Sequence, residues 1–168
     1  LWGGTAYPVL IELLCDPQVT SLAKRLIIDI LASKRVFESI DSILRCTETE
    51  NDDEIVIGCL KAISLFETPD GLPIALRKVS SPNWVIRVQA VRALGYVGTR
   101  DTVPLLESML YHDTDFRVRM SAAEALARLG ENGCAVLRQA ASSDAAVSDV
   151  YGDIGRIAAT VLGENDQE

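Results

Sequence analysis

Apolar residues recur along the chain at intervals of three or four, the period of helices that bury one face. The clearest stretch, residues 88–98, returns 32 residues later as residues 120–130. A fixed period of this length is typical of stacked helical units, none of which buries its apolar face alone. The shared positions are Ala90, Ala93, Leu94, Val97 and Gly98 in the first copy and Ala122, Ala125, Leu126, Leu129 and Gly130 in the second.

Each unit is predicted to contain two antiparallel helices, which we name A and B, joined by a polar turn. Pro73 and Pro104 stand in the first turn of two A helices, where the missing N–H of proline would have no partner in any case. Residues 80–83 and 112–115 are the expected turns of these two units. The unit boundaries are expected at about residues 5–33, 36–68, 72–98, 102–130 and 133–163.

The outer units follow the same plan less regularly. We expect helices over residues 36–46 and 53–66 in the second unit, and over 134–141 and 150–162 in the fifth. The last of these helices would contain Gly152 and Gly155 and would turn Val150, Ile154, Ile157 and Val161 toward the core. The predicted fold is therefore all-α: one domain over residues 1–168, an α-solenoid of about five antiparallel helix pairs in a right-handed superhelix.

Composition agrees with a folded chain, because 48% of the residues are hydrophobic and the mean hydropathy is +0.18. The first residue is leucine, and Leu1-Trp2-Gly3-Gly4 stand where residues 97–98 end a repeat. We therefore expect a fragment of a longer protein, cut at a repeat boundary. The apolar face of the first unit would then be partly uncovered, which favours weak self-association through this end.

Net charge and cysteine content indicate which kinds of partner and which cellular compartment to expect. The net charge of −8 argues against nucleic acid, although residues 77–138 hold nine Lys and Arg against six Asp and Glu. No run of 18 apolar residues occurs, so no membrane insertion is expected. The four cysteines, Cys15, Cys46, Cys59 and Cys134, form no Cys-x-x-Cys pair and stand among apolar residues. They are interpreted as reduced, buried thiols of a cytoplasmic protein.

The repeated segments resemble the HEAT-repeat family in its short, PBS-lyase HEAT-like form. The residues that carry the resemblance are Val85-Ile86-Arg87 with residues 90–98, and Arg117-Val118-Arg119 with residues 122–130. The resemblance implies that B helices line the inner, concave surface of the solenoid. Members of the family serve as scaffolds, adaptors, lyase subunits and occasionally enzymes, so the resemblance is specific for fold and weak for function.

The resemblance also implies an ion-pair ladder between units. Arg87 and Arg119 occupy the same repeat position, near the start of helix B, where the family's arginine pairs with an aspartate of a turn. Asp113, with Asp115, is the expected carboxylate for Arg119. The turn before Arg87 offers Ser81 and Asn83 instead. The ladder is expected to be incomplete, since Thr20 and Val56 replace the arginine in the first two units.

No catalytic pattern stands out. The family's metal-dependent hydroxylases use paired His-Glu motifs, whereas the one histidine here, His112, stands in a turn. No phosphate-binding glycine loop and no metal-binding Cys/His spacing occurs. Residues 48–54 carry five carboxylates without the spacing of a calcium loop, and are interpreted as a solvated loop before a helix. We expect no catalytic residue, no metal and no cofactor.

Superposing the B helices on the repeat predicts a column of mostly cationic side chains. It contains Arg25, Lys61, Arg92, Glu124 and Arg156, and the column one turn later contains Asp29, Leu65, Tyr96, Arg128 and Thr160. On the concave surface these cations and Tyr96 would suit an acidic segment of a protein partner. The candidate binding residues are Arg25, Lys61, Arg92, Tyr96, Arg128 and Arg156. The alternative is that these exposed side chains only keep the surface soluble and bind no partner.

The leading functional hypothesis is a non-catalytic interaction or scaffold module that binds another protein along the groove of its B helices. The alternative, suggested by the family resemblance alone, is a subunit of a bilin lyase or a related modifying enzyme. A HEAT-like nucleic-acid glycosylase would need a strongly basic face, which the net charge of −8 disfavours.

Overall fold

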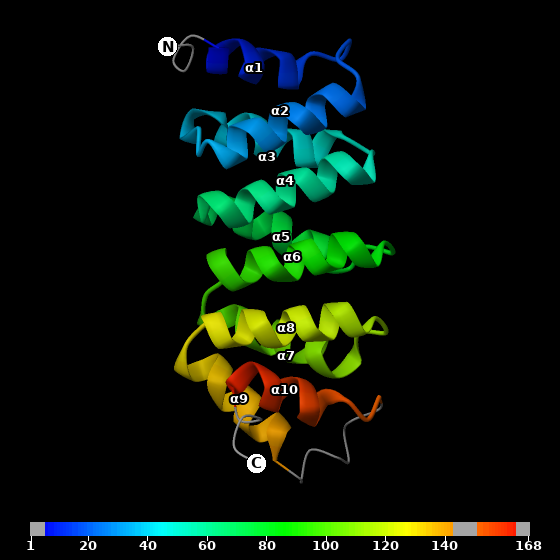
Figure 1. The fold of residues 1–168 in the computed structure, drawn as a ribbon, viewed down its shortest axis with the longest axis vertical. Coiled ribbons are helices and arrows are strands. Elements are labelled where there is room, and N and C mark those ends of the chain that lie inside the picture. The colour runs from blue at the N-terminus through cyan, green and yellow to red at the C-terminus, as the bar shows by residue number, and fades with distance from the viewer. Residues whose placement is uncertain (1–5, 143–150, 164–168) are drawn as a thin grey trace.

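The chain was analysed as a computed structural model that describes residues 6–142 and 151–163. Within these ranges the chain forms ten α-helices and three short 3₁₀ turns, with no β-strand (Figure 1). The helices are α1 (Ala6–Cys15), α2 (Ser21–Ser33), α3 (Ile40–Thr49), α4 (Asp53–Phe66), α5 (Leu72–Lys78), α6 (Trp84–Val97), α7 (Val103–His112), α8 (Phe116–Arg128), α9 (Glu131–Ala141) and α10 (Ile154–Leu162). The 3₁₀ turns η1 (Phe37–Ser39), η2 (Pro69–Gly71) and η3 (Arg100–Thr102) precede α3, α5 and α7.

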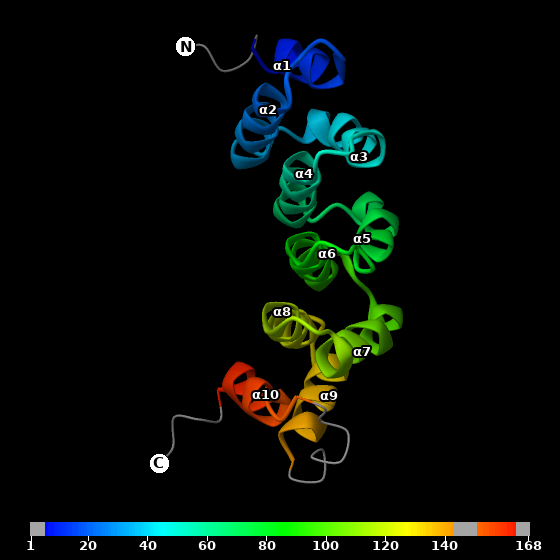
Figure 2. The same cartoon turned by 90° about the vertical axis from the view of Figure 1, so that its right-hand side faces the viewer.

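The helices form two layers along a stack of antiparallel pairs. The even-numbered helices are the predicted B helices, and each packs on the next, α2 on α4, α4 on α6, and α6 on α8. Figure 2 shows these B helices on the inner side of a bowed stack, with α3, α5 and α7 on the outer side. The architecture is the expected all-α, HEAT-like solenoid, and its concave face is formed by the B helices.

The B helices of the first four units begin with the same kind of side-chain cap. Thr20, Asp52, Asn83 and Asp115 precede α2, α4, α6 and α8, and each side-chain oxygen accepts a hydrogen bond from a backbone N–H of the first turn. Such caps satisfy donors that have no partner inside the helix. A short polar side chain at these four positions therefore ends each turn and fixes where helix B starts.

The core lies between the two layers and between successive units. Leu94 of α6 and Leu126 of α8, the same repeat position, are both fully buried. The two helices approach closely at Gly95, where an added Cβ would lie 3.0 Å from the Cα of Ala125. Small residues at this contact therefore set the spacing between neighbouring units.

The structure corrects several boundaries predicted from the sequence. The helix expected over residues 36–46 is instead η1 followed by α3, which extends to Thr49. The last helix begins at Ile154, so Gly152, with φ of +69°, lies before it and not inside it. Ile154 and Ile157 are buried as expected, and Val161 is half-buried. Val150 and residues 1–4 lie outside the described residues.

The first unit exposes an apolar edge. Leu22, Leu26 and Ile30 lie one turn apart on α2 and are all exposed, Leu26 by 54%. The equivalent positions of α4 and α6 include Ala62 and Ala93, which are fully buried against the preceding B helix. The side of α2 that would face a preceding helix therefore carries large apolar side chains in contact with solvent.

Candidate interaction surface

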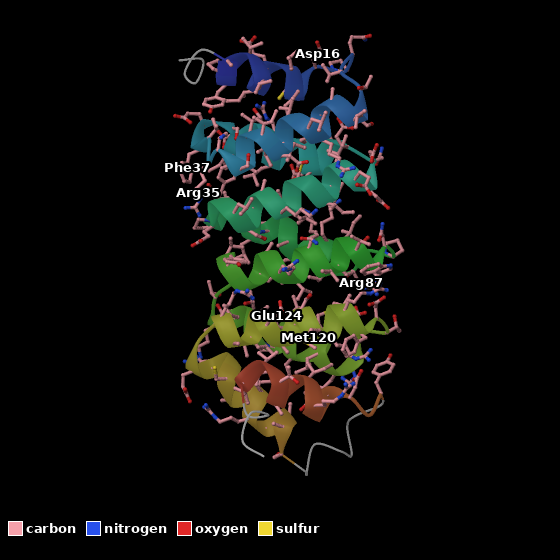
Figure 3. The ribbon with its side chains drawn as sticks, viewed as in Figure 1. Asp16, Arg35, Phe37, Arg87, Met120 and Glu124 are labelled. Carbon is pink, nitrogen blue, oxygen red and sulfur yellow. The ribbon has the colours of Figure 1, made fainter. Side chains whose placement is uncertain are left out.

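The predicted cationic column lies on the helices that line the concave side. Arg25, Lys61, Arg92 and Arg156 are exposed on α2, α4, α6 and α10. In the fourth unit the column position belongs to Glu124, which Figure 3 shows on the face of α8 toward the viewer, beside Met120. The column is thus basic on both sides of one acidic position.

A shallow groove of about 260 Å³ lies between α4 and α6 on this face. Lys61 and Arg92 supply its cations, and Leu65 and Tyr96 supply exposed apolar surface one turn further along the same helices. Two polar side chains complete the lining, Ser64 and Gln89. The groove therefore combines positive charge, hydrogen-bonding groups and apolar area, the mixture found at protein interfaces.

The cations of this face differ in their internal partners. Arg25 lies 3.1 Å from Glu54 in an exposed ion pair. Among the described residues, no salt bridge involves Lys61, Arg92 or Arg156. Charge on the groove between α4 and α6 is therefore not neutralised by a described carboxylate at ion-pair distance.

Arg128 extends the groove from α8. Its guanidinium lies 4.9 Å from the ring centroid of Tyr96, and its Nη1 donates to the carbonyl oxygen of Glu124 at 3.2 Å. This contact holds the exposed Tyr96 ring beside a positive charge, an arrangement that is attractive between cation and ring face. The structure thus brings together Lys61, Arg92, Tyr96 and Arg128, while Arg156 lies apart on α10.

The predicted ladder arginines lie at the start of their helices, and their carboxylate partners differ from those expected. Asp113 accepts a bidentate pair of hydrogen bonds from Arg87, at 2.8 and 2.9 Å, and not from Arg119. Arg119 instead donates to the carboxylate of Asp153, with Nη2 at 2.5 Å, and to the carbonyl oxygen of Asp113. Each arginine therefore reaches the turn of the following unit, one unit further than the sequence reasoning assumed.

The ion pair between Arg87 and Asp113 is largely buried, which indicates that it holds neighbouring units together. The side chains of Arg87 and Asp113 are only 14% and 6% exposed, and hydrogen bonding to the Asp113 carboxylate raises the pKa of Arg87 above its usual value. Arg87 also donates to the backbone carbonyls of Ser81 and Pro82. The guanidinium thus connects the turn of its own unit to the turn of the next.

The carboxylates of the acidic segment 48–54 make contacts within the chain. Each carboxylate has a partner: Glu48 with Arg77, Glu50 with Lys24, Asp52 with the backbone N–H of Glu54, Asp53 with the amide of Asn83, and Glu54 with Arg25. No group of three or more His, Cys, Asp or Glu in the described ranges has the geometry of a metal site. The segment joins neighbouring units, a role that its composition alone did not reveal.

The remaining expectations concern single residues. His112 is exposed at the end of α7, and its ring lies 6.2 Å from that of Tyr111. Cys15 is exposed and Cys134 half-buried, so the expectation of four buried thiols is wrong for these two.

Over residues 6–142 and 151–163, no helix combines the length and apolar character that crossing a bilayer requires.

The sequence pattern did not predict two of the groove residues, Ser64 and Gln89, because their repeat positions face the neighbouring unit. Gln89 is almost fully buried and Ser64 half-buried, so the column of solvent-facing positions did not contain them. Polar side chains at otherwise apolar positions are the signal that would have identified them, since buried polar groups need partners.

Comparison with known proteins supports the fold. Residues 72–150 match the family described as HEAT repeats, which covers the third and fourth units and α9. No curated protein matches the chain. The third and fourth units are those in which the repeat is most regular in the sequence. The matched segment is therefore similar to HEAT repeats, and the described residues fold as a HEAT-like α-solenoid.

Proposed function

We propose that this chain is a non-catalytic protein-interaction module that binds an acidic segment of a partner along its concave face. The observation that carries the proposal is the groove between α4 and α6, where two cations without a described ion-pair partner flank exposed apolar side chains. HEAT repeats generally mediate protein–protein interaction or scaffolding, which agrees with this reading.

The partner segment should alternate acidic and apolar residues. Carboxylates would pair with Lys61 and Arg92, and an apolar side chain would pack between Leu65 and Tyr96. Arg128 would add a contact at the next unit, whereas Glu124 would repel a carboxylate placed beside α8. The segment's acidic residues should therefore lie over α4 and α6.

Charge reversal tests the proposal directly. Titration of fluorescent acidic peptides, with and without an apolar residue between the carboxylates, measures affinity for the native chain. We expect Arg92→Glu to weaken binding by at least about tenfold, the result of losing one charge-assisted contact and gaining repulsion. Binding should also weaken as salt concentration rises, because the charges are exposed.

Arg100→Glu provides the matched control. Arg100 is exposed in η3, outside the lining of the groove, and its reversal changes the net charge by the same amount. Equal losses in the two variants would mean that only the overall charge matters, and the groove assignment would then be wrong.

The bilin lyase-like alternative is tested by colour. A tetrapyrrole held in the groove would acquire an altered visible absorbance band on mixing with the chain, and Lys61→Glu would abolish the change. The interaction-module proposal expects an unchanged spectrum. We also propose a cytoplasmic location, since all four cysteines are free thiols, which suits a reducing compartment.

A further inference from the structure

Gln89 lies at the floor of the groove between α4 and α6, two helices on the inner side of the stack (Figure 2). Gln89 is only 9% exposed, and Ser64 opposite it on α4 is half-buried. The other lining residues are exposed and form the rim: Lys61, Leu65, Arg92 and Tyr96. The groove therefore has a neutral, polar floor between a charged and apolar rim.

The carboxamide of Gln89 makes no hydrogen bond to the part of the chain that the structure describes. Every fully enclosed side-chain nitrogen or oxygen in that part does have a partner. The amide of Gln89 is therefore not fully enclosed, and because the residue lines the groove, its amide opens into the groove. Ser64 differs, since its hydroxyl donates to the carbonyl oxygen of Leu60 at 3.2 Å. Gln89 thus offers a nearly buried polar group to a partner from outside the chain.

The chemistry of a primary amide selects the group that fits it. The Gln89 side chain donates through its NH₂ group and accepts through its carbonyl oxygen. A carboxylate only accepts, so an acidic side chain at the floor would leave the carbonyl oxygen of Gln89 without a donor. A residue in an extended strand turns its own N–H and C=O to the same side, whereas a helix uses these groups internally. The floor therefore fits the main chain of an extended segment.

We propose that Gln89 hydrogen-bonds the main chain of an extended partner segment, accepting from the N–H of one residue and donating to its C=O. This inference rests on the proposed function of the groove and adds the conformation in which the partner binds. Side chains of an extended segment alternate between two sides. Carboxylates on one side then reach Lys61 and Arg92, and apolar side chains on the other pack against Leu65 and Tyr96, one turn further along the same helices.

Replacing main-chain amides of the partner by esters tests this contact. The probe is a short fluorescent peptide with one leucine between two glutamates, and an ester at each position in turn removes one N–H while keeping the side chains. With the native chain, one ester position should weaken binding by about three- to tenfold, the effect of losing a neutral hydrogen bond. Gln89→Met should weaken binding of the amide peptide by a similar factor. The sensitive ester should then cost nothing further, because both changes remove the same contact.

Gln139→Met is the matched control, since Gln139 is exposed on α9, outside the lining of the groove. Its affinity for the peptide should equal that of the native chain. Urea unfolding should show that Gln89→Met is at least as stable as the native chain, because the change removes a nearly buried amide that has no described partner. A clear loss of stability in Gln89→Met would mean that the amide serves the packing of the helices, and the proposal would then be wrong.

The binding outcomes separate this inference from the proposed function. If Arg92→Glu weakens binding while every ester costs the same in the native chain and in Gln89→Met, the groove binds acidic segments without this main-chain contact, and only the inference fails. If neither Arg92→Glu nor Gln89→Met changes the affinity, the groove is not the binding site and both fail.

An adenine base also presents a donor and an acceptor side by side, and a glutamine amide can pair with both. Competition with adenosine, which carries no charge, distinguishes a base from a peptide main chain at the floor. The proposal expects the bound peptide to be unaffected. Displacement of the peptide by adenosine from the native chain, but not from Gln89→Met, would overturn the main-chain contact.

Discussion

Removing the carboxylate of Asp113 tests whether the inter-unit ion pair stabilises the solenoid. In Asp113→Ala, the Arg87 guanidinium loses both of its carboxylate hydrogen bonds while it remains largely buried. The same change removes the acceptor for the backbone N–H of Asp115, 2.9 Å from Oδ1 of Asp113. The substitution therefore removes both the ion pair to the preceding unit and a hydrogen bond within the turn of its own unit.

The magnitude follows from the burial of the pair. Breaking a buried ion pair by deleting one partner costs about 3–5 kcal/mol, because an uncompensated charge stays behind. Arg87 keeps its two backbone acceptors, the carbonyls of Ser81 and Pro82. We therefore expect the low end of this range, about 3 kcal/mol, which is a large share of the about 5–15 kcal/mol that stabilises an ordinary domain.

Urea unfolding followed by circular dichroism measures the change in the free energy of unfolding. Arg77→Ala is the matched control, because Arg77 and Glu48 also join neighbouring units but are 55% and 53% exposed. An exposed pair of this kind contributes about 0–1 kcal/mol. If Asp113→Ala costs no more than Arg77→Ala, the buried pair does not stabilise the repeat interface, and the reasoning from burial fails.

Three further predictions concern the core, acid stability and the apolar edge. Leu94→Ala and Leu126→Ala should each lower the free energy of unfolding by about 2–5 kcal/mol, as measured in urea, because both side chains are fully buried. Hydrogen bonding to Arg117 lowers the pKa of Asp115 below its ordinary 3.8, so its stabilising contribution should be present above that pH and disappear as pH falls further; Asp115→Asn should flatten this part of the acid unfolding curve. Sedimentation at high concentration should show weak self-association that Leu26→Glu abolishes, and monomeric native chain throughout would contradict the role of this edge.

The regular repeat explains why the architecture was predictable. The B helices α2, α4, α6 and α8 begin with a short polar cap, such as Asp115, and α6 and α8 carry alanine and leucine at the same intervals, as at Ala93 and Leu94. Local propensity, capping and apolar period therefore all indicate the same helices. Where the period is weaker the boundaries moved, as at Gly152, whose positive φ places it before α10.

The pairing of the ladder was less predictable, because it depends on how far one unit is displaced from the next. Arg87 and Asp113 are 26 residues apart, while Arg119 and Asp153 are 34 apart. Repeat alignment identified the arginines, since they share one position. It did not show that a long guanidinium reaches forward into the following turn, a fact set by the packing of whole helices.

The two sets of arginines on the B helices differ in burial and in whether a carboxylate of the chain pairs with their charge. Arg87 lies at the start of α6, buried and held by Asp113, so its charge serves the packing of units. Arg92 lies five residues later on the same helix, exposed at the groove, with no described carboxylate at ion-pair distance. Because a buried, paired cation stabilises the stack and an exposed, unpaired one does not, stability measurements should respond to Arg87→Ala and barely to Arg92→Ala. Partner binding should show the opposite order, and that inversion is what separates a binding column from a structural ladder on one helix.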